Sequence, residues 1–338
     1  MDQVLQRKHS SIILLLLITL FGLIVISVNV GYKDIPLVSV VKALLGMEVG
    51  DFGKIIIDFR LPRIIIAILV GAGLAVSGAV IQGIVKNPLA APGLLGINSG
   101  AGLVVIGFIV IGGTLKMSSI LALPFLSLLG AAVVGILIYL LAYEDTMGIN
   151  PMKMVFYGIA IQAGVNAIMT ILVITLNESQ MDFLVRWQSG SIWNANWEFI
   201  SALMPWIIIG GLYMMKKAST MDILALGNTL ATGLGLNVSK EKGKLLFTAI
   251  ALAASSVAVS GTMNFVGLIA PHIARKLVGE RYRILLPTSA LLGAVLVLLA
   301  DTIGRKLIEP AEIPAGIVVS VIGAPYFIYL LIRLRKEE

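Results

Sequence analysis

Long apolar stretches without any charged side chain dominate the chain, and short segments between them carry most of the polar residues. A helix that crosses a membrane needs about 20 consecutive, mostly apolar residues. Eight stretches are of about this length and predict eight spanning helices. They cover residues 12–30, 64–85, 89–113, 117–143, 154–177, 199–215, 284–300 and 313–332.

A ninth uncharged stretch, residues 245–274, is too long for one crossing and too short for two complete ones. Its middle reads Ser260-Gly261-Thr262-Met263-Asn264, which is a polar and flexible break. We therefore expect one helix that ends near residue 261 and a shorter helix from about 264 to 278. Together with the other eight stretches, this predicts an all-α membrane protein of about ten helices, with residues 1–338 in a single domain.

The composition excludes an ordinary soluble domain. Charged residues make up 13% and hydrophobic residues 58% of the chain, whereas soluble domains carry roughly 25% charged residues. When about ten helices are laid out across a membrane, both termini fall on the side that holds most of the 25 Lys and Arg residues. Basic loops face the cytoplasm, so we expect cytoplasmic termini and no nucleic-acid partner for the net charge of +7.

Three connecting segments are long enough to matter. Residues 31–62 are expected outside, with a short surface helix. Residues 177–198 form a second outer loop that holds Trp187, Trp193 and Trp197. These tryptophans either anchor the protein at the membrane interface or contact a substrate. Residues 216–244 form the longest inner loop.

A short internal repeat is also present. In each copy a proline follows the last glycine ten residues on, and the two copies fall on helices of opposite direction. This is the pattern of inverted repeats in transporters, although short matches also arise by chance in helices rich in small residues. The copies are Ala75-Val76-Ser77-Gly78 with Pro88, and Ala258-Val259-Ser260-Gly261 with Pro271.

The sequence offers little to an enzyme. It has no cysteine, its two histidines are His9 and His272, and it contains no phosphate-binding loop, so neither a metal site nor ATP hydrolysis is expected in this chain. Ionisable residues are scarce in the middle of the spans, where ion-driven transporters need them. We therefore expect a partner ATPase to supply the energy. A secondary transporter driven by an ion gradient is the alternative.

Three arginines run against the charge bias. Arg60 and Arg63 begin the second span at its outer end, and Arg305 ends the ninth span. They either contact lipid headgroups and pair locally with Asp58 and Asp301, or form a docking surface for an acidic partner outside. Arginine suits either role, because its guanidinium binds carboxylates in a bidentate manner.

Three ordered blocks of residues cover roughly residues 55–335. The first holds Arg60-Leu61-Pro62-Arg63, Gly71 to Gly78, Gln82, Asn87 to Ala90, Pro92 and Leu95 to Ala101; the second holds Gly261 and Phe265 to Arg275; the third holds Ala300 to Thr302, Arg305, Glu312 to Pro314, Gly316 and Gly323 to Pro325. In these blocks the chain resembles the FecCD family, the permeases of iron-siderophore and vitamin B12 ABC importers. One departure is Ala91, where the family commonly has an acidic residue.

The resemblance implies a type II importer fold with inverted-repeat halves. Members pair as two permeases, identical or sister chains, around a central pathway in the bacterial plasma membrane. A dimer of cytoplasmic ATPases uses the ATP, and the permease itself binds no cofactor. An extracytoplasmic substrate-binding protein delivers the cargo. In the family, arginines at the positions of Arg60, Arg63 and Arg305 face acidic groups on that protein, which favours the docking role.

The resemblance also implies roles for the inner loops. The loop at 216–244 is expected to fold into short coupling helices that fit a groove on the ATPase, and its apolar character favours burial against a partner. The residues expected at this contact are Leu224, Leu226, Gly227, Ala231, Leu234 and Gly235. The loops after the second and fourth spans are expected to form the cytoplasmic gate, with Asn87, Leu89, Gly148 and Asn150.

The substrate pathway leaves the weakest trace in the sequence. Gln162 and Asn166 are four positions apart and share one helix face, which either lines the pathway or packs against another helix. A ferric hydroxamate siderophore is the favoured cargo, with other siderophores, haem and cobalamin as alternatives. A scaffold that anchors a receptor without transporting anything is a further alternative, and membrane lipid is a partner in every case.

Overall fold

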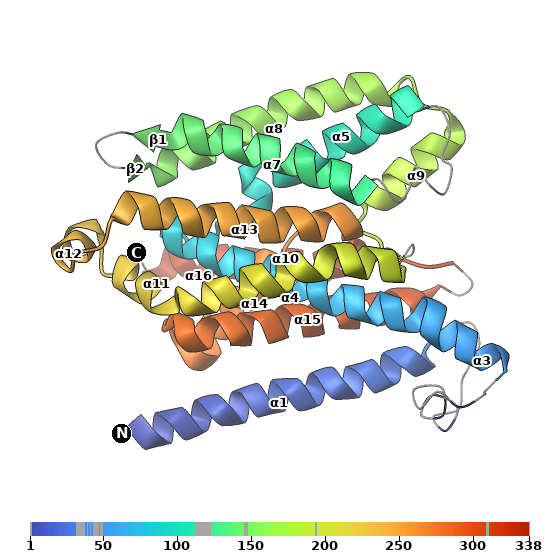
Figure 1. The fold of residues 1–338 in the computed structure, drawn as a ribbon, viewed down its shortest axis with the longest axis horizontal. Coiled ribbons are helices and arrows are strands. Elements are labelled where there is room, and N and C mark those ends of the chain that lie inside the picture. Colours follow the sequence, from blue (N-terminus) through green and yellow to red (C-terminus); the bar gives the residue numbers. More distant parts are fainter. Residues whose placement is uncertain are drawn as a thin grey trace.

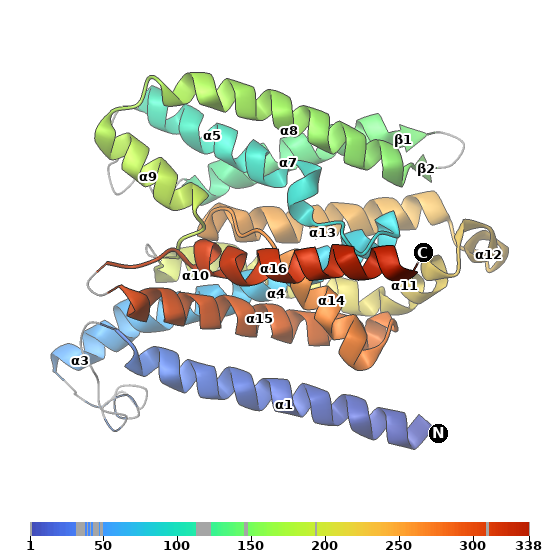
Figure 2. The same cartoon turned by 180° about the vertical axis from the view of Figure 1, so that it is seen from behind.

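The chain folds into a bundle of long helices that run roughly parallel or antiparallel to one another (Figures 1 and 2). The computed structural model describes residues 2–31, 38, 40, 42, 47, 50–112, 123–144, 148–192, 195–308 and 311–337. The segments 32–37 and 113–122 and Trp193, which belong to an expected surface segment, a loop with the start of the fourth span, and an outer loop, lie outside the described residues.

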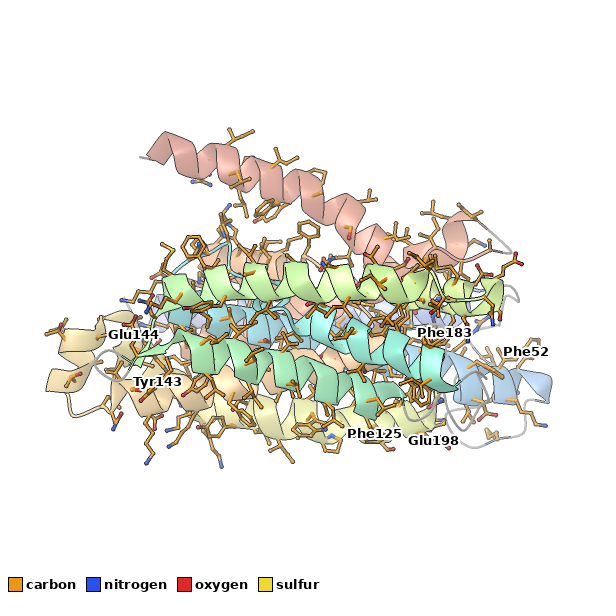
Figure 3. All side chains as sticks on the ribbon, turned by 90° about the horizontal axis from the view of Figure 1, so that it is seen from above. Phe52, Phe125, Tyr143, Glu144, Phe183 and Glu198 are labelled. Carbon is orange, nitrogen blue, oxygen red and sulfur yellow. The ribbon has the colours of Figure 1, made fainter. Side chains whose placement is uncertain are left out.

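Two ends of the bundle can be told apart. Both termini, α12 (Asn228–Gly233) and a hairpin of β1 (Tyr143–Glu144) and β2 (Gly148–Ile149) lie at one end, named here the α12 end. The opposite end carries α9 (Glu178–Gln188) and is named the α9 end. Figure 3 labels Tyr143 and Glu144 at the α12 end, and Phe125 and Phe183 toward the α9 end.

The other elements follow one another along the bundle axis. They are α1 (Asp2–Asn29), α3 (Asp51–Lys54), the π-helix η1 (Ile55–Arg60), α4 (Leu61–Val85), the 3₁₀-helix η2 (Pro92–Leu95), α5 (Ile97–Gly112), α7 (Leu123–Ala142), α8 (Pro151–Val173), α10 (Trp197–Lys216), α11 (Ala218–Ala225), α13 (Val238–Ser260), α14 (Val266–Val278), α15 (Tyr282–Leu307) and α16 (Ala315–Glu337).

Among the described residues, eight helices are long and apolar enough to cross a membrane. Two shorter apolar helices, α5 and the 13-residue α14, complete the set of ten predicted from the sequence. The predicted break in the ninth stretch is confirmed, because α13 ends at Ser260 and α14 begins at Val266.

Asparagine side chains begin four of the helices. Asn150, Asn177, Asn196 and Asn237 each accept a hydrogen bond from a backbone N–H in the first turn of α8, α9, α10 and α13. Such a cap satisfies a donor that has no partner within the helix and contributes about 1 kcal/mol. In α9 the side chain of Gln180 completes a capping box with Asn177, which explains why the expected outer loop contains a helix.

Glycines let α4 pack at the centre of the bundle against α13, α14 and α15. A Cβ added to Gly71 would lie 2.2 Å from the carbonyl oxygen of Gly293 on α15. A Cβ added to Gly78 would lie 1.8 Å from the carbonyl oxygen of Gly267 on α14. The backbones therefore touch directly at both points, as small residues in membrane helices allow.

Two helix starts differ from the prediction. The helix of the second span begins at Asp51 and runs through η1 into α4, so it takes in residues expected in a loop. The third span was expected from residue 89, but α5 begins only at Ile97. Pro88 and Pro92 prevent a regular helix there, and Gly96 adopts a left-handed conformation with φ of 63° between η2 and α5.

The two copies of the short repeat occupy different local positions. Ser77 lies within α4, where its Oγ donates to the carbonyl oxygen of Ala249 on α13 at 2.6 Å. Ser260 is the last residue of α13. The tetrapeptide therefore marks two contacts of one antiparallel helix pair with different local geometry.

Candidate functional site

An open groove of about 430 Å³ lies where the break between α13 and α14 meets α5, α8 and α9. The groove collects the two predicted pathway residues, Gln162 and Asn166, on one face of α8. The full lining is Asn98, Ser99, Gly102, Gln162, Asn166, Met169, Thr170, Val173, Trp187, Gln188, Thr262 and Asn264. The sequence indicated the break at Asn264 but gave no sign that Asn98 and Gln188 would face it.

Irregular backbone builds the floor of the groove. Gly261 ends α13 with φ of 68°, and Phe265 also has a positive φ of 68° just before α14. The hydroxyl of Thr262 donates to the carbonyl oxygen of Gln188. The amide of Asn98 donates to Oδ1 of Asn264 at 3.1 Å. Non-helical backbone at this depth is tolerated where it lines a cavity.

The groove is polar but uncharged. Amides and hydroxyls provide its hydrogen-bonding groups, and none of the described lining side chains is ionisable. Trp187 supplies an aromatic wall in this groove, whereas the sequence left it between an interface anchor and a substrate contact. Trp197 has a different position, since its Nε1 donates to the carbonyl oxygen of Ile57 at 3.1 Å.

At the α9 end, the predicted local pairing with Asp301 is present. Nε of Arg63 lies 2.9 Å from Oδ1 of Asp301, and Nη1 of Arg63 lies 2.8 Å from Oε2 of Glu312. Nε of Arg305 lies 3.2 Å from Oδ2 of the same aspartate. Asp301 is buried, whereas the side chain of Glu312 is 44% exposed. The network therefore has a closed centre and one acidic group open to solvent.

Arg60 and Arg305 also hold the end of α1. Arg60 donates to the carbonyl oxygen of Val28. Arg305 donates through Nη1 to the carbonyl oxygen of Val30 at 2.8 Å and through Nη2 to that of Ser27 at 3.2 Å. The last carbonyls of a helix lack intrahelical partners and carry partial negative charge. Two of the three arginines expected to dock a partner are thus buried as caps of α1, and Arg63 is the more exposed.

At the α12 end, residues 216–244 form two short helices, α11 and α12. The leucines of this segment divide into two groups. Leu224 and Ala231 are buried, whereas Leu226 and Leu234 are 60% and 63% exposed. Leu230, which the sequence did not single out, is also 60% exposed. Gly227 and Gly235 have positive φ angles of 110° and 84°, and each follows a helix end. The exposed leucines form an apolar surface in a region that is otherwise polar.

Three polar contacts fasten α11 and α12 to the spanning helices. Asp222 accepts from the backbone N–H of Tyr282 at 2.8 Å and so caps the start of α15. Nζ of the buried Lys242 on α13 donates to Oδ1 of Asn228 at 3.0 Å. Nζ of Lys217 lies 2.7 Å from Oε2 of Glu241. A displacement of α11 and α12 would therefore be passed to α13 and α15.

The residues expected at a gate lie in two turns. Asn87 closes a turn after α4, where its Oδ1 accepts from the N–H of Leu89 at 2.9 Å. Asn150 caps α8 and donates from Nδ2 to Oε1 of Glu144 at 3.1 Å, and Gly148 pairs with Glu144 in the hairpin. A hydrogen bond from the Lys153 ammonium, with a further one from Asn150, lowers the pKa of Glu144 below its ordinary value.

Comparison with known proteins gives the family. The FecCD transport family matches residues 15–333. The iron(3+)-hydroxamate import system permease protein FhuG of Bacillus subtilis (strain 168) is 42% identical over 336 residues, which cover 97% of this chain and 99% of that protein. The Fe(3+)-citrate import system permease protein YfmE of the same organism is 43% identical over 333 residues, 98% of each chain.

Solved structures give the fold. A structure described as an inward-facing conformation of a metal-chelate type ABC transporter aligns with a TM-score of 0.83 at 29% identity, over 96% of this chain and 99% of that chain. PsaBC from Streptococcus pneumoniae aligns with a TM-score of 0.54 at 19% identity, over 86% of this chain and 94% of that chain. These alignments confirm the predicted type II importer fold. The chain belongs to the FecCD transport family and is a membrane permease rather than an enzyme.

Proposed function

We propose that this chain is one of two permeases in an ATP-driven importer of ferric chelates, with the groove as its half of the translocation pathway. The second permease is another copy or a sister chain. In this proposal the α9 end faces outward and the α12 end, with both termini, faces the cytoplasm of a bacterial plasma membrane.

The observation that carries the proposal is the uncharged polar groove at the α13–α14 break. Asn166 and Thr170 on α8 are exposed in the single chain, and such side chains are unfavourable against lipid. A second permease that covers this face would enclose the groove as a pathway. Transporters of many kinds bind cargo where helices are interrupted near mid-membrane.

The chemistry of the groove favours a ferric hydroxamate as cargo. Hydroxamate groups are anionic when they bind Fe(III), and three of them cancel its charge, whereas complexes with citrate or catecholate ligands keep a negative charge. An anionic complex would need basic groups to offset its desolvation, and none of the described lining side chains supplies one. Relatives named for hydroxamate and for citrate are about equally similar, so this charge argument decides our preference.

The α9 end is the proposed docking surface for an extracytoplasmic substrate-binding protein. Arg63 is the residue best placed to pair with an acidic group of that protein, because its present partner Glu312 is solvent-exposed and can be replaced. Arg60 and Arg305 fix the end of α1 and the position of Asp301 beneath Arg63. They therefore support the docking surface from within.

The α12 end is the proposed contact with a cytoplasmic ATPase dimer. Leu226, Leu230 and Leu234 would fill an apolar groove on the ATPase, while Leu224, Gly227, Ala231 and Gly235 shape the two short helices. Nucleotide-driven closure would displace α11 and α12 and, through Asp222 and Lys242, the helices α13 and α15. The turns of Asn87 with Leu89, and of Gly148 with Asn150, would then open as a gate.

The test is uptake of radiolabelled iron into proteoliposomes that hold this permease, its sister where one is needed, and the ATPase. We expect ATP-dependent uptake of a ferric hydroxamate delivered by its binding protein. Arg63→Glu should lower uptake about tenfold or more, which corresponds to ~1.4 kcal/mol. The control Lys54→Glu reverses an exposed charge near the same end and should leave uptake unchanged.

Each part of the proposal can fail separately in this experiment. Uptake that follows an ion gradient and ignores ATP would contradict the ATP-driven importer. Equal uptake of ferric hydroxamate and ferric dicitrate, each delivered by its own binding protein, would contradict the argument from the uncharged groove. Unchanged uptake with Arg63→Glu would move the docking surface elsewhere.

A further inference from the structure

A second groove, of about 470 Å³, lies between α10 and α13 and is almost entirely apolar. The two helices lie side by side on the face shown in Figure 1, and α16 lies on the face shown in Figure 2. Trp206 is 44% and Phe247 is 61% exposed. The lining is Pro205, Trp206, Ile209, Gly210, Tyr213, Phe247, Thr248, Ala251 and Leu252.

The groove is the length of one membrane leaflet and the width of a single chain of methylenes. Its α10 side runs from Pro205 to Tyr213, which is about 12 Å of helix and close to the ~15 Å hydrocarbon depth of one leaflet. A helix with side chains is about 10–12 Å across, so 470 Å³ would hold little more than one turn of it. An acyl chain fits the same space along its length.

The groove runs into a group of lysines at the α12 end. On α10 the lining positions 205, 206, 209, 210 and 213 continue with helical spacing to Lys216 and Lys217. On α13 the lining positions 252, 251, 248 and 247 continue in the same way to Lys244 and Lys240. Both walls of the groove therefore end in basic side chains at one level of the bundle.

The lysines keep a net positive charge. Nζ of Lys217 and Nζ of Lys244 lie 2.7 Å and 3.2 Å from the two carboxylate oxygens of Glu241. Lys216 and Lys240 are exposed beside this pair. One carboxylate among four ammonium groups leaves an excess of positive charge where the headgroups of a bilayer would lie. Basic pockets between helices on the cytoplasmic side of a membrane bind anionic lipid headgroups.

We propose that this groove is a binding site for an anionic diacyl phospholipid from the leaflet at the α12 end. One acyl chain lies between α10 and α13 against Trp206 and Phe247, and the phosphate is held by Lys216 and Lys244. The proposal is independent of the cargo and of the partner ATPase. It concerns the chain as it sits in a bilayer.

The experiment uses quenching of tryptophan fluorescence by lipids that carry bromine on their acyl chains. The full chain is reconstituted into bilayers in which a small fraction of brominated phosphatidylglycerol or brominated phosphatidylcholine replaces unlabelled phosphatidylcholine. We expect phosphatidylglycerol to quench several-fold more strongly than phosphatidylcholine at equal mole fraction. The chain has four tryptophans, so Trp206→Phe should remove the difference between the two lipids.

Neutralisation of the lysines tests the headgroup contact. The double variant Lys216→Gln with Lys244→Gln should quench equally with both lipids. The control Lys8→Gln with Arg283→Gln removes the same charge from exposed positions on α1 and α15 at the same end and should keep the preference. Salt provides a measurement on the unaltered chain, because 1 M salt shortens the screening length to ~3 Å and should weaken the preference.

Three results would overturn the proposal. Equal quenching of the unaltered chain by both lipids would mean ordinary contact with bulk lipid. A preference that survives Trp206→Phe would place the anionic lipid elsewhere. An absence of quenching at Trp206 by either lipid would mean that another protein segment covers the groove.

Discussion

Gly261 stands where α13 ends, with φ of 68° and ψ of −162°. Other residues rarely adopt this conformation, which costs them about 1–3 kcal/mol. A Cβ there would also lie 1.9 Å from the carbonyl oxygen of Trp187, whose side chain lines the groove. We expect Gly261→Ala to lower the Tm of the purified protein by about 5 °C or more, as followed by intrinsic fluorescence on heating.

Gly107 on α5 is the matched control for this substitution. A Cβ at Gly107 would have nothing within 4 Å, and the residue lies inside a helix. Gly107→Ala should therefore keep or raise the Tm, because alanine loses less backbone entropy on folding. Equal Tm values for the two variants would mean that the loop at the break tolerates a different backbone path.

At this scale the sequence was informative where side chains meet side chains. The pairing of Asp301 with Arg63 and Arg305 could be predicted, because charges at one membrane face must find partners. The capping of α1 by Arg60 and Arg305 could not, since the acceptors are backbone carbonyls that every residue has. The same reason hides Thr262, whose hydroxyl bonds the carbonyl oxygen of Gln188.

Among the elements, α1 depends most on a few polar contacts, because much of its length faces outward. Loss of Arg305 would leave Asp301 short of one cation and two carbonyls of α1 without their donor. The native chain has no cysteine, so Val28→Cys provides a single buried reporter. We expect Arg305→Met to raise the rate of maleimide modification at this position about tenfold or more, consistent with loss of ~1.4 kcal/mol of local stability.

Arg63→Gln in the same Val28→Cys background separates this effect from a general loss of charge. Arg63 pairs with Asp301 and Glu312, and its printed contacts include no atom of α1. The modification rate should then remain near that of the parent. A similar rise with both variants would show that the whole network, and not the cap, holds α1.

The short helix α12 should act as a contact surface without contributing to folding. Replacement of Leu226, Leu230 and Leu234 by serine removes apolar surface that the bundle itself leaves exposed. We expect the triple variant to lose copurification with the ATPase while its Tm stays within a few degrees of the native value. Thr232→Ala, in the same helix, should keep the association, and full ATPase binding by the triple variant would refute the coupling role.

Helix number and helix breaks could be predicted, whereas helix starts could not. Stretch length and the polar run at Ser260 to Asn264 are local signals, and both were sufficient. The early start at Asp51 reflects packing of η1 and α4 against α1 and α15, which no local pattern encodes. The late start of α5 could have been predicted from Pro88 and Pro92 with more weight on the prolines.

The whole molecule presents two different faces to its surroundings. The α8 face is polar at Gln162, Asn166 and Thr170, and we expect a second permease to cover it. The α10–α13 face is apolar and basic at its rim. In the assembled importer, Asn166→Cys should cross-link to the second permease carrying the same change at its aligned position. Ile209→Cys, which is 69% exposed on the other face, should not cross-link; the reverse pattern would exchange the roles of the two faces.

The uncharged wall of the pathway has a consequence for the order of events in transport. A surface with dipoles but no fixed charge creates only a shallow energy minimum for a neutral solute, so we expect the enclosed groove to retain cargo weakly. The permease then works as a low-affinity conduit that releases its load as soon as the inner gate opens. Sorting and concentration of scarce iron must be complete before the cargo enters the membrane.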